Sequence, residues 1–160
     1  MPCYFFSPAG TSSRISVTPC MRLIWVAGVR ILQKMTISRK NILVVDDEPS
    51  WLKVLRYFLE NKGYSVLTVG SGTEALKSLQ TFHPDIILSD VRMPEMNGFD
   101  LLDTIRKTPA VASTPVIFFS AIDDYDARKT AKDLGAADYI VKPFDQEEVA
   151  SVLHKHLDLP

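Results

Sequence analysis

The sequence predicts an α/β fold with a five-stranded parallel sheet and helices on both faces. Five short apolar runs recur along the chain, and most are nearly continuous, which is typical of strands buried on both faces of a parallel sheet. Helical patterns separate the runs, and the links between them are short. The common order for five such strands is the flavodoxin-like 2-1-3-4-5, with a switch point between strands 1 and 3.

Each strand is predicted from one apolar run bounded by polar or turn-forming residues. The runs are Ile42–Val45, Tyr64–Val69, Ile86–Leu88, Val116–Phe119 and Tyr139–Val141. Each lies ahead of an amphipathic pattern with apolar residues at helical spacing. The chain is therefore expected to form five consecutive strand–helix units from residue 41 onward.

Local signals indicate where several of the helices begin and end. Pro49 suits a first helical position, and Gly63 suits the end of that helix. Ser71 is followed three residues later by Glu74, which is the pattern of a capping box. Asp145 is placed to open the last helix, since an aspartate before an apolar helical pattern accepts backbone hydrogen bonds.

The first 38 residues differ from the rest and are expected to form a low-order N-terminal extension ahead of one domain, residues 39–160. They show no sustained period of 2 or 3.6. The apolar run Leu23–Val29 is too short to span a bilayer, and no convincing signal-peptide cleavage site follows it. Three origins stay open: an organelle transit peptide, a flexible tail, or translation that really begins at Met35. We favour Met35.

Charge is distributed unevenly along the chain. The first 40 residues hold six basic residues and no acid, which leaves 12 basic and all 19 acidic residues for the remainder, a formal charge of −7. An acidic domain is poorly suited to nucleic acid and well suited to a cation. The only cysteines, Cys3 and Cys20, precede the domain, so the domain needs no disulfide, as expected for a cytoplasmic protein. We predict neither a nucleic-acid nor a membrane partner.

Polar side chains follow four of the predicted strands. Asp46 and Asp47 follow the first strand, Asp90 the third, Ser120 the fourth and Lys142 the fifth. Singly, each has an ordinary role, such as opening a helix or facing solvent. Together they meet at one edge of the sheet, where three carboxylates repel one another unless a cation neutralises them.

The chemistry of these side chains favours Mg²⁺ and phosphorus. Carboxylate oxygens suit Mg²⁺, whereas Ca²⁺ needs more ligands, and no His/Cys spacing indicates zinc. A carboxylate such as Asp90 can act as a nucleophile toward phosphorus, with Mg²⁺ and Lys142 stabilising the charge on the transferred group.

Four motifs occur in the order and spacing of a known family. They are Ile42–Asp47, Asp90–Pro94, Phe119–Ala121 and Ala137–Phe144. With these motifs the chain resembles the response-regulator receiver domains of two-component signalling, and in particular stand-alone receivers of the chemotaxis type.

The resemblance implies a phosphorylation site and a metal site. Asp90 would accept a phosphoryl group from a histidine kinase or a histidine phosphotransfer protein. Mg²⁺ would be bound by Asp47, Asp90 and the backbone carbonyl of Arg92, with Asp46 helping through water. Lys142 would contact the phosphoryl group.

The resemblance also implies a conformational switch and a partner. Ser120 would contact the phosphoryl group and form a switch pair with Tyr139, and the Lys142–Pro143 peptide bond would be cis. A downstream protein would bind the face made by helix 4, strand 5 and helix 5. Nothing in the sequence after the fifth helix indicates a DNA-binding or catalytic output domain.

Two other functions compete with this interpretation. A Mg²⁺-dependent phosphohydrolase with an Asp nucleophile usually needs a second acid two residues later, where this chain has Arg92. A phosphate-independent scaffold would not need the complete acidic set. Two nearby residues stay open. Arg92 either shields the phosphoryl group or pairs with its oxygens, or it faces solvent. Trp51 lies near the acidic pocket, packs beside Leu55 and Phe58, or does both.

Overall fold

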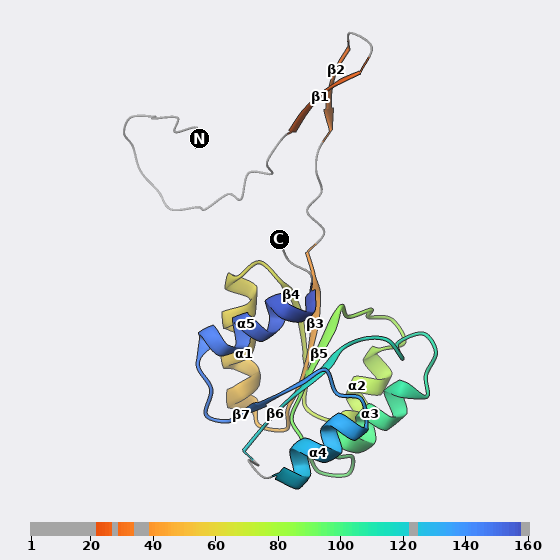
Figure 1. The fold of residues 1–160 in the computed structure, drawn as a ribbon, viewed down its shortest axis with the longest axis vertical. Helices are drawn as coiled ribbons and strands as arrows, with labels where there is room; N and C mark the ends of the chain where they lie inside the picture. Colours follow the sequence, from red (N-terminus) through yellow and green to blue (C-terminus); the bar gives the residue numbers. More distant parts are fainter. Residues whose placement is uncertain (1–21, 27–28, 34–38, 122–124, 158–160) are drawn as a thin grey trace. The chain divides into compact units, whose positions relative to one another are not determined.

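The computed structural model describes residues 22–26, 29–33, 39–121 and 125–157 (Figure 1). The chain forms two units, Met1–Ser38 and Arg39–Pro160.

The first unit contains an antiparallel hairpin that the sequence analysis did not predict. Strand β1 (Arg22–Val26) pairs with β2 (Val29–Gln33), and Trp25 lies opposite Arg30. The apolar run Leu23–Val29 covers most of β1 but only the first residue of β2, and strands of five residues are too short for a period to stand out. The favoured start at Met35 lies outside the described residues.

The second unit is built on a sheet of five parallel strands. They are β3 (Asn41–Val45), β4 (Ser65–Val69), β5 (Ile86–Ser89), β6 (Val116–Ser120) and β7 (Asp138–Val141). Their spatial order is β4-β3-β5-β6-β7, which confirms the predicted 2-1-3-4-5 arrangement. Val44 of β3 lies opposite Thr68 of β4 on one side and Leu88 of β5 on the other, so β3 and β5 end side by side.

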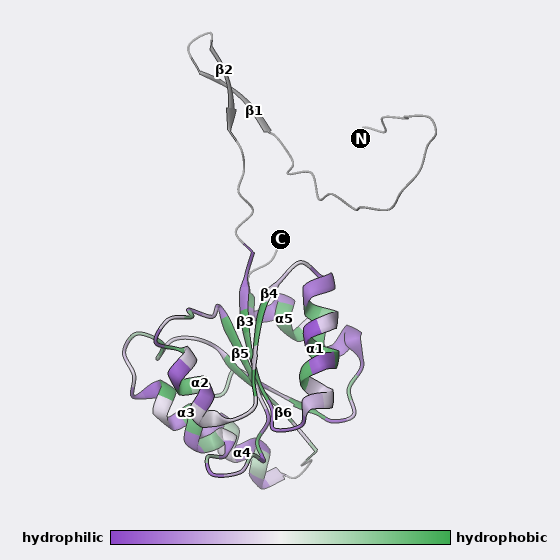
Figure 2. Ribbon diagram, turned by 180° about the vertical axis from the view of Figure 1, so that it is seen from behind, coloured by the Kyte–Doolittle hydropathy of each residue, from purple (hydrophilic) through white to green (hydrophobic). Residues whose placement is uncertain are grey.

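Helices cover both faces of this sheet, as predicted. They are α1 (Pro49–Asn61), α2 (Gly72–Ser78), α3 (Gly98–Arg106), α4 (Tyr125–Asp133) and α5 (Gln146–Leu157). Figures 1 and 2 show α1 and α5 on one face and α2, α3 and α4 on the other.

Each strand serves two apolar cores at once. Ile42 and Val44 of β3 belong to the core shared with α1 and α5, whereas Leu43 and Val45 belong to the core shared with α2, α3 and α4. All four side chains are fully buried. Burial on both faces explains why the strands appear in the sequence as continuous apolar runs rather than alternating ones.

The helix-start signals are found in the structure, with one difference. The Ser71 hydroxyl accepts the backbone N–H of Glu74, and the Asp145 carboxylate accepts that of Glu148. The Glu74 carboxylate, however, accepts the N–H of Gly70 rather than that of Ser71. The donor is therefore one residue earlier than in the predicted capping box.

A close contact at Gly98 brings the start of α3 against the end of β5. The Gly98 N–H donates to the carbonyl of Val91 at 2.9 Å. A Cβ atom on Gly98 would lie 2.3 Å from the carbonyl oxygen of Asp90 and 2.9 Å from the ring of Phe118. Only glycine allows this approach, which fixes the loop that follows Asp90.

Candidate functional site

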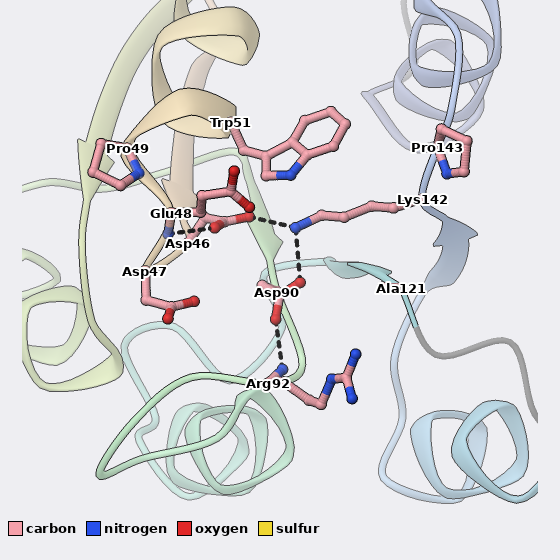
Figure 3. Close-up of a pocket in the computed structure, with 10 residues that line it drawn as sticks. All are labelled: Asp46, Asp47, Glu48, Pro49, Trp51, Asp90, Arg92, Ala121, Lys142 and Pro143. Atoms are coloured by element: carbon pink, nitrogen blue, oxygen red, sulfur yellow. Dashed lines mark hydrogen bonds and ion pairs between the residues drawn. The ribbon is translucent and has the colours of Figure 1, made fainter.

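A cavity of about 580 Å³ opens where β3, β5 and β7 end. Figure 3 shows the residues that line it, which come from four separate parts of the chain: Asp46, Asp47, Glu48, Pro49, Trp51, Asp90, Arg92, Ala121, Lys142 and Pro143. The structure thus brings together every predicted metal ligand and Lys142. Ser120 and Tyr139 do not belong to this lining.

Lys142 bridges two of the acids. Its Nζ donates to Oδ2 of Asp46 at 2.6 Å and to Oδ1 of Asp90 at 2.9 Å (Figure 3). The side chains of Lys142, Asp46 and Asp90 are 10%, 1% and 8% exposed. Charges this far removed from water interact strongly, and they are costly unless they are paired. The bridge therefore joins the ends of β3, β5 and β7.

The other oxygen of each acid accepts a backbone N–H from the turn that follows it. Oδ1 of Asp46 accepts the N–H of Glu48 at 2.8 Å, and Oδ2 of Asp90 accepts that of Arg92 at 2.5 Å. Burial nevertheless raises the pKa of Asp46, against the lowering effects of Lys142 and the Glu48 N–H, and the neighbouring charge of Asp90 raises it further.

Asp47 and the backbone of Arg92 provide oxygen atoms of a different kind. Asp47 is exposed, and within the described part of the chain its carboxylate makes no hydrogen bond or ion pair. The carbonyl of Arg92 likewise accepts no hydrogen bond from a described residue. Both lie at the pocket, whose lining has four carboxylates, those of Asp46, Asp47, Glu48 and Asp90, against the two cations of Lys142 and Arg92.

This set of donors suits a hard divalent cation. It offers carboxylate and carbonyl oxygens and an excess of negative charge, the features that Mg²⁺ prefers. Among the described residues, no three His, Cys, Asp or Glu side chains already stand together as a metal site. The ammonium of Lys142 lies between Asp46 and Asp90 instead, so the cation would be received chiefly by Asp47 and the Arg92 carbonyl.

Aromatic rings form one wall beside Lys142; the sequence analysis considered Trp51 there but missed Phe119 and Phe144. The ammonium of Lys142 lies 5.1 Å from the ring centroid of Trp51 and 5.2 Å from that of Phe119. The ring of Phe144 packs against both, with its centroid 5.1 Å from that of Trp51 and 5.7 Å from that of Phe119. The positions of Phe119 before Ser120 and Phe144 after Lys142 were the available signals.

Trp51 and Arg92, whose roles the sequence left open, both line the pocket. Trp51 lines the pocket and packs on Phe144, in agreement with the prediction that its indole lies near the acids. The backbone N–H of Arg92 binds Asp90, while its exposed guanidinium makes no ion pair with a described residue. The role of that guanidinium stays a prediction.

The proposed switch residues lie to one side of the pocket. Ser120 is fully buried at the end of β6, and its carbonyl accepts the N–H of Lys142 at 2.8 Å. The ring of Tyr139 packs on Phe118 and lies 5.3 Å from the guanidinium carbon of Arg128 in α4. Tyr139 borders a second cavity, of about 320 Å³. The Lys142–Pro143 peptide bond is cis.

Comparison with known proteins identifies the family. The sequence profile described as response regulator receiver domain matches residues 42–154, which include every strand of the sheet but the first residue of β3. The chain belongs to the response regulator receiver family. This receiver domain is 41% identical over 115 residues to a probable transcriptional regulator, ycf27, of Cyanophora paradoxa, a match that covers 72% of this chain and 47% of the relative.

Solved structures agree with that assignment. The chemotaxis protein CheY4 of Vibrio cholerae superposes with a TM-score of 0.72 at 32% identity, covering 75% of this chain and all of that one. The receiver domain of the sensor histidine kinase PA1611 of Pseudomonas aeruginosa, with a magnesium ion coordinated in its active-site cleft, gives 0.70 at 29% identity, covering 76% of this chain and all of that one.

Family membership fixes the general role of the domain. Receivers are regulatory phosphoacceptor domains of two-component signalling, not a family of catalytic enzymes. They are phosphorylated by histidine kinases and bind Mg²⁺ in the active site. The chain spans about half the length of the curated relatives that it first matches. No helix in the described part of the chain is long and apolar enough to cross a membrane.

Proposed function

We propose that this receiver domain carries its phosphoryl group on Asp90 and takes it from the phosphohistidine of a histidine kinase or a phosphotransfer protein. The observation that carries the proposal is the binding of the Asp90 carboxylate. Lys142 holds one of its oxygens and the Arg92 N–H holds the other, at the edge of a pocket large enough for a phosphoryl group.

The transfer follows from the chemistry of these groups. An oxygen of Asp90 attacks phosphorus, the bond from phosphorus to the imidazole nitrogen breaks, and the imidazole leaves with the bonding electrons. Lys142, released from Oδ1 of Asp90, then pairs with a phosphoryl oxygen and keeps its bond to Asp46. A bound Mg²⁺ would withdraw negative charge from the phosphoryl oxygens.

The same pocket supplies the metal ligands in this proposal. Asp47, Asp90 and the Arg92 carbonyl would hold Mg²⁺, and Asp46 would help through water. Two of these oxygens, on Asp47 and on the Arg92 backbone, are not taken by described residues, which supports the assignment. The excess of carboxylates over Lys142 provides the charge that the cation neutralises.

The signal would leave the pocket through Ser120 and Tyr139. The hydroxyl of Ser120 turns toward the phosphoryl group, and the ring of Tyr139 turns inward. The packing of Tyr139 on Phe118 and beside Arg128 of α4 supports a link between the core and this surface. A downstream protein would recognise the face made by α4, β7 and α5, in the cytoplasm.

In this proposal residues 39–160 form the receiver domain and residues 1–38 form an N-terminal extension.

Phosphorylation can be tested by intact mass. The full chain is incubated with acetyl phosphate and Mg²⁺, and we expect the mass of one added phosphoryl group. Asp90→Asn, or excess chelator, should abolish the addition, because the nucleophile or the cation is removed. Asp103→Asn is the matched control, since it removes an exposed acid that pairs with Lys107 away from the pocket. Undiminished labelling of Asp90→Asn rules the proposal out.

A further inference from the structure

We propose that Trp51 and Phe119 are positioning residues that hold the ammonium of Lys142 in place while it changes hydrogen-bond partners. This inference rests on the proposed phosphorylation of Asp90 and extends it. Lys142 emerges from the end of β7, Trp51 from the first turn of α1 and Phe119 from β6. Three elements thus meet around one charged group.

The contacts have the geometry of cation–π interactions. The Nζ atom of Lys142 lies over the ring of Trp51 at 5.1 Å and over that of Phe119 at 5.2 Å. Both distances are within the roughly 6 Å over which a ring face attracts a cation. The side chain of Lys142 is 10% exposed, so little water competes with the rings for the charge. The attraction is strongest for such a desolvated ammonium.

A third ring, that of Phe144, packs against both Trp51 and Phe119. Phe144 lies 5.1 Å from Trp51 with the rings tilted by 40°, and 5.7 Å from Phe119 with the rings at 73°. Phe119 is almost fully buried, whereas Trp51 is only half-buried and stands at the start of α1. Helical side chains lean toward the N-terminus of their helix, which directs the Trp51 indole over the pocket.

During the transfer Lys142 keeps its hydrogen bond to Asp46 and loses the one to Asp90, so a single hydrogen bond is left to orient the ammonium while the other is exchanged. An ammonium has three donors, and in this structure two of them bind Asp46 and Asp90. When Asp90 receives the phosphoryl group, the bond to Oδ1 must be exchanged for one to a phosphoryl oxygen. Attraction to a ring face depends weakly on the direction of each N–H, so it persists while this bond is exchanged.

The test compares ring substitutions in the full chain. Phosphorylation rates with acetyl phosphate at saturating Mg²⁺ are measured for Trp51→Leu and Trp51→Phe, with Tyr57→Leu as an aromatic-to-leucine control at an exposed position of the same helix. We expect Trp51→Leu to be about three- to tenfold slower, because leucine fills space without a π face. Trp51→Phe should recover most of the rate, and Tyr57→Leu should match the wild type.

A double-mutant cycle separates positioning from packing. If Trp51 acts through Lys142, Trp51→Leu should slow the wild type but add almost nothing to Lys142→Ala. The NMR shift of the Lys142 ε-methylene gives a readout that needs no phosphorylation. Ring currents should displace this signal in the wild type and in Trp51→Phe, and much less in Trp51→Leu.

The outcomes distinguish this inference from the proposed function. Equal rates and equal ε-methylene shifts for the wild type and Trp51→Leu overturn the inference. So does an equal slowing by Trp51→Leu and Trp51→Phe, which would indicate lost packing. A wild type that is not labelled on Asp90 overturns the proposed function instead, and the methylene shift then still decides whether the rings hold Lys142.

Discussion

Two aspartate–lysine ion pairs in this domain have similar N–O distances, but the pKa values of their two aspartates shift in opposite directions. Asp46 and Lys142 meet at 2.6 Å in the pocket, with side chains 1% and 10% exposed. Asp138 and Lys155 meet at 2.9 Å where β7 begins and α5 ends, with side chains 26% and 65% exposed. Burial raises the pKa of Asp46 despite its hydrogen bonds from Lys142 and the Glu48 N–H.

The pKa of Asp138 moves the other way. Burial alone would raise it, but hydrogen bonds from Lys155, His156 and the Tyr139 N–H, together with the charge of Lys155, lower it below the ordinary value of 3.8. Ionised Asp138 therefore stabilises the fold above pH 3.8, and this contribution is lost as the pH falls through its folded pKa. Asp46 costs stability as it ionises, because its folded pKa lies above 3.8.

The opposite pKa shifts indicate that the Asp138 pair stabilises the fold, whereas the acids of the pocket destabilise it. The pair at the amino end of β7 balances the negative charge of Asp138 with the positive charge of Lys155, and the ring of His156 adds a hydrogen bond to Asp138 at 3.2 Å. The pocket has more carboxylates than cations, and Asp46, Asp90 and Lys142 are almost fully removed from water. Such an arrangement lowers the stability of the folded state and leaves charge available for a ligand.

The largest difference between the two pairs should appear when each lysine is removed. Lys142→Met leaves Asp46 and Asp90 buried without a cation, and we expect a loss of about 3 kcal/mol in the free energy of unfolding at neutral pH. Lys155→Met should cost at most about 1 kcal/mol, because its charge is mostly solvated. Urea unfolding of both variants without Mg²⁺ measures this. Equal losses would contradict the comparison.

Much of this fold follows from the sequence for a physical reason. Strands buried on both faces need continuous apolar runs, so β3 and β6 could be located within one residue. The hairpin formed by β1 and β2 could not, because its apolar run, Leu23–Val29, covers most of β1 but only the first residue of β2. Its pairing depends on a register that no period in ten residues reveals.

The candidate site was predicted in its residues but not in its bonds. Acids at strand ends identify the pocket, since parallel strands end at one edge. The bridge from Lys142 to Asp46 joins side chains 96 residues apart, and its choice of Asp46 over Asp47 depends on rotamers set by packing. For the same reason, the position of Phe119 before Ser120 indicates that it lies near the pocket but not that its ring faces Lys142.

A smaller change in the free energy of unfolding, one that depends on pH, is expected when Asp138 is replaced. Asp138→Asn removes a group with a lowered pKa, so the wild type should be more stable by about 0.5–1 kcal/mol above pH 5. The difference should shrink below pH 3.8, as Asp138 becomes protonated in both states. Urea unfolding from pH 7 to pH 3 measures it. A difference that grows toward low pH would contradict the lowered pKa of Asp138.

The smallest effect concerns Asp47, whose carboxylate has no partner among the described residues. Asp47→Asn should raise the stability of the metal-free protein by about 0.5 kcal/mol, because it relieves repulsion from Asp46 and Asp90 and breaks no bond. Millimolar Mg²⁺ should reverse the order, since the wild type binds the cation more tightly and is stabilised by it. Thermal unfolding in excess chelator and in Mg²⁺ gives both values for each protein.

The control is Glu60→Gln, which removes an exposed acid near the other end of α1. Its difference in stability from the wild type should be the same in chelator and in Mg²⁺. If Asp47→Asn is the less stable protein in chelator as well, Asp47 has a structural partner and the excess of charge in the pocket is compensated. If it is the more stable protein in both conditions, the charge analysis holds and Asp47 is not a metal ligand. Reversal by Mg²⁺ alone links the stability lost in the pocket to the cation that the pocket would bind.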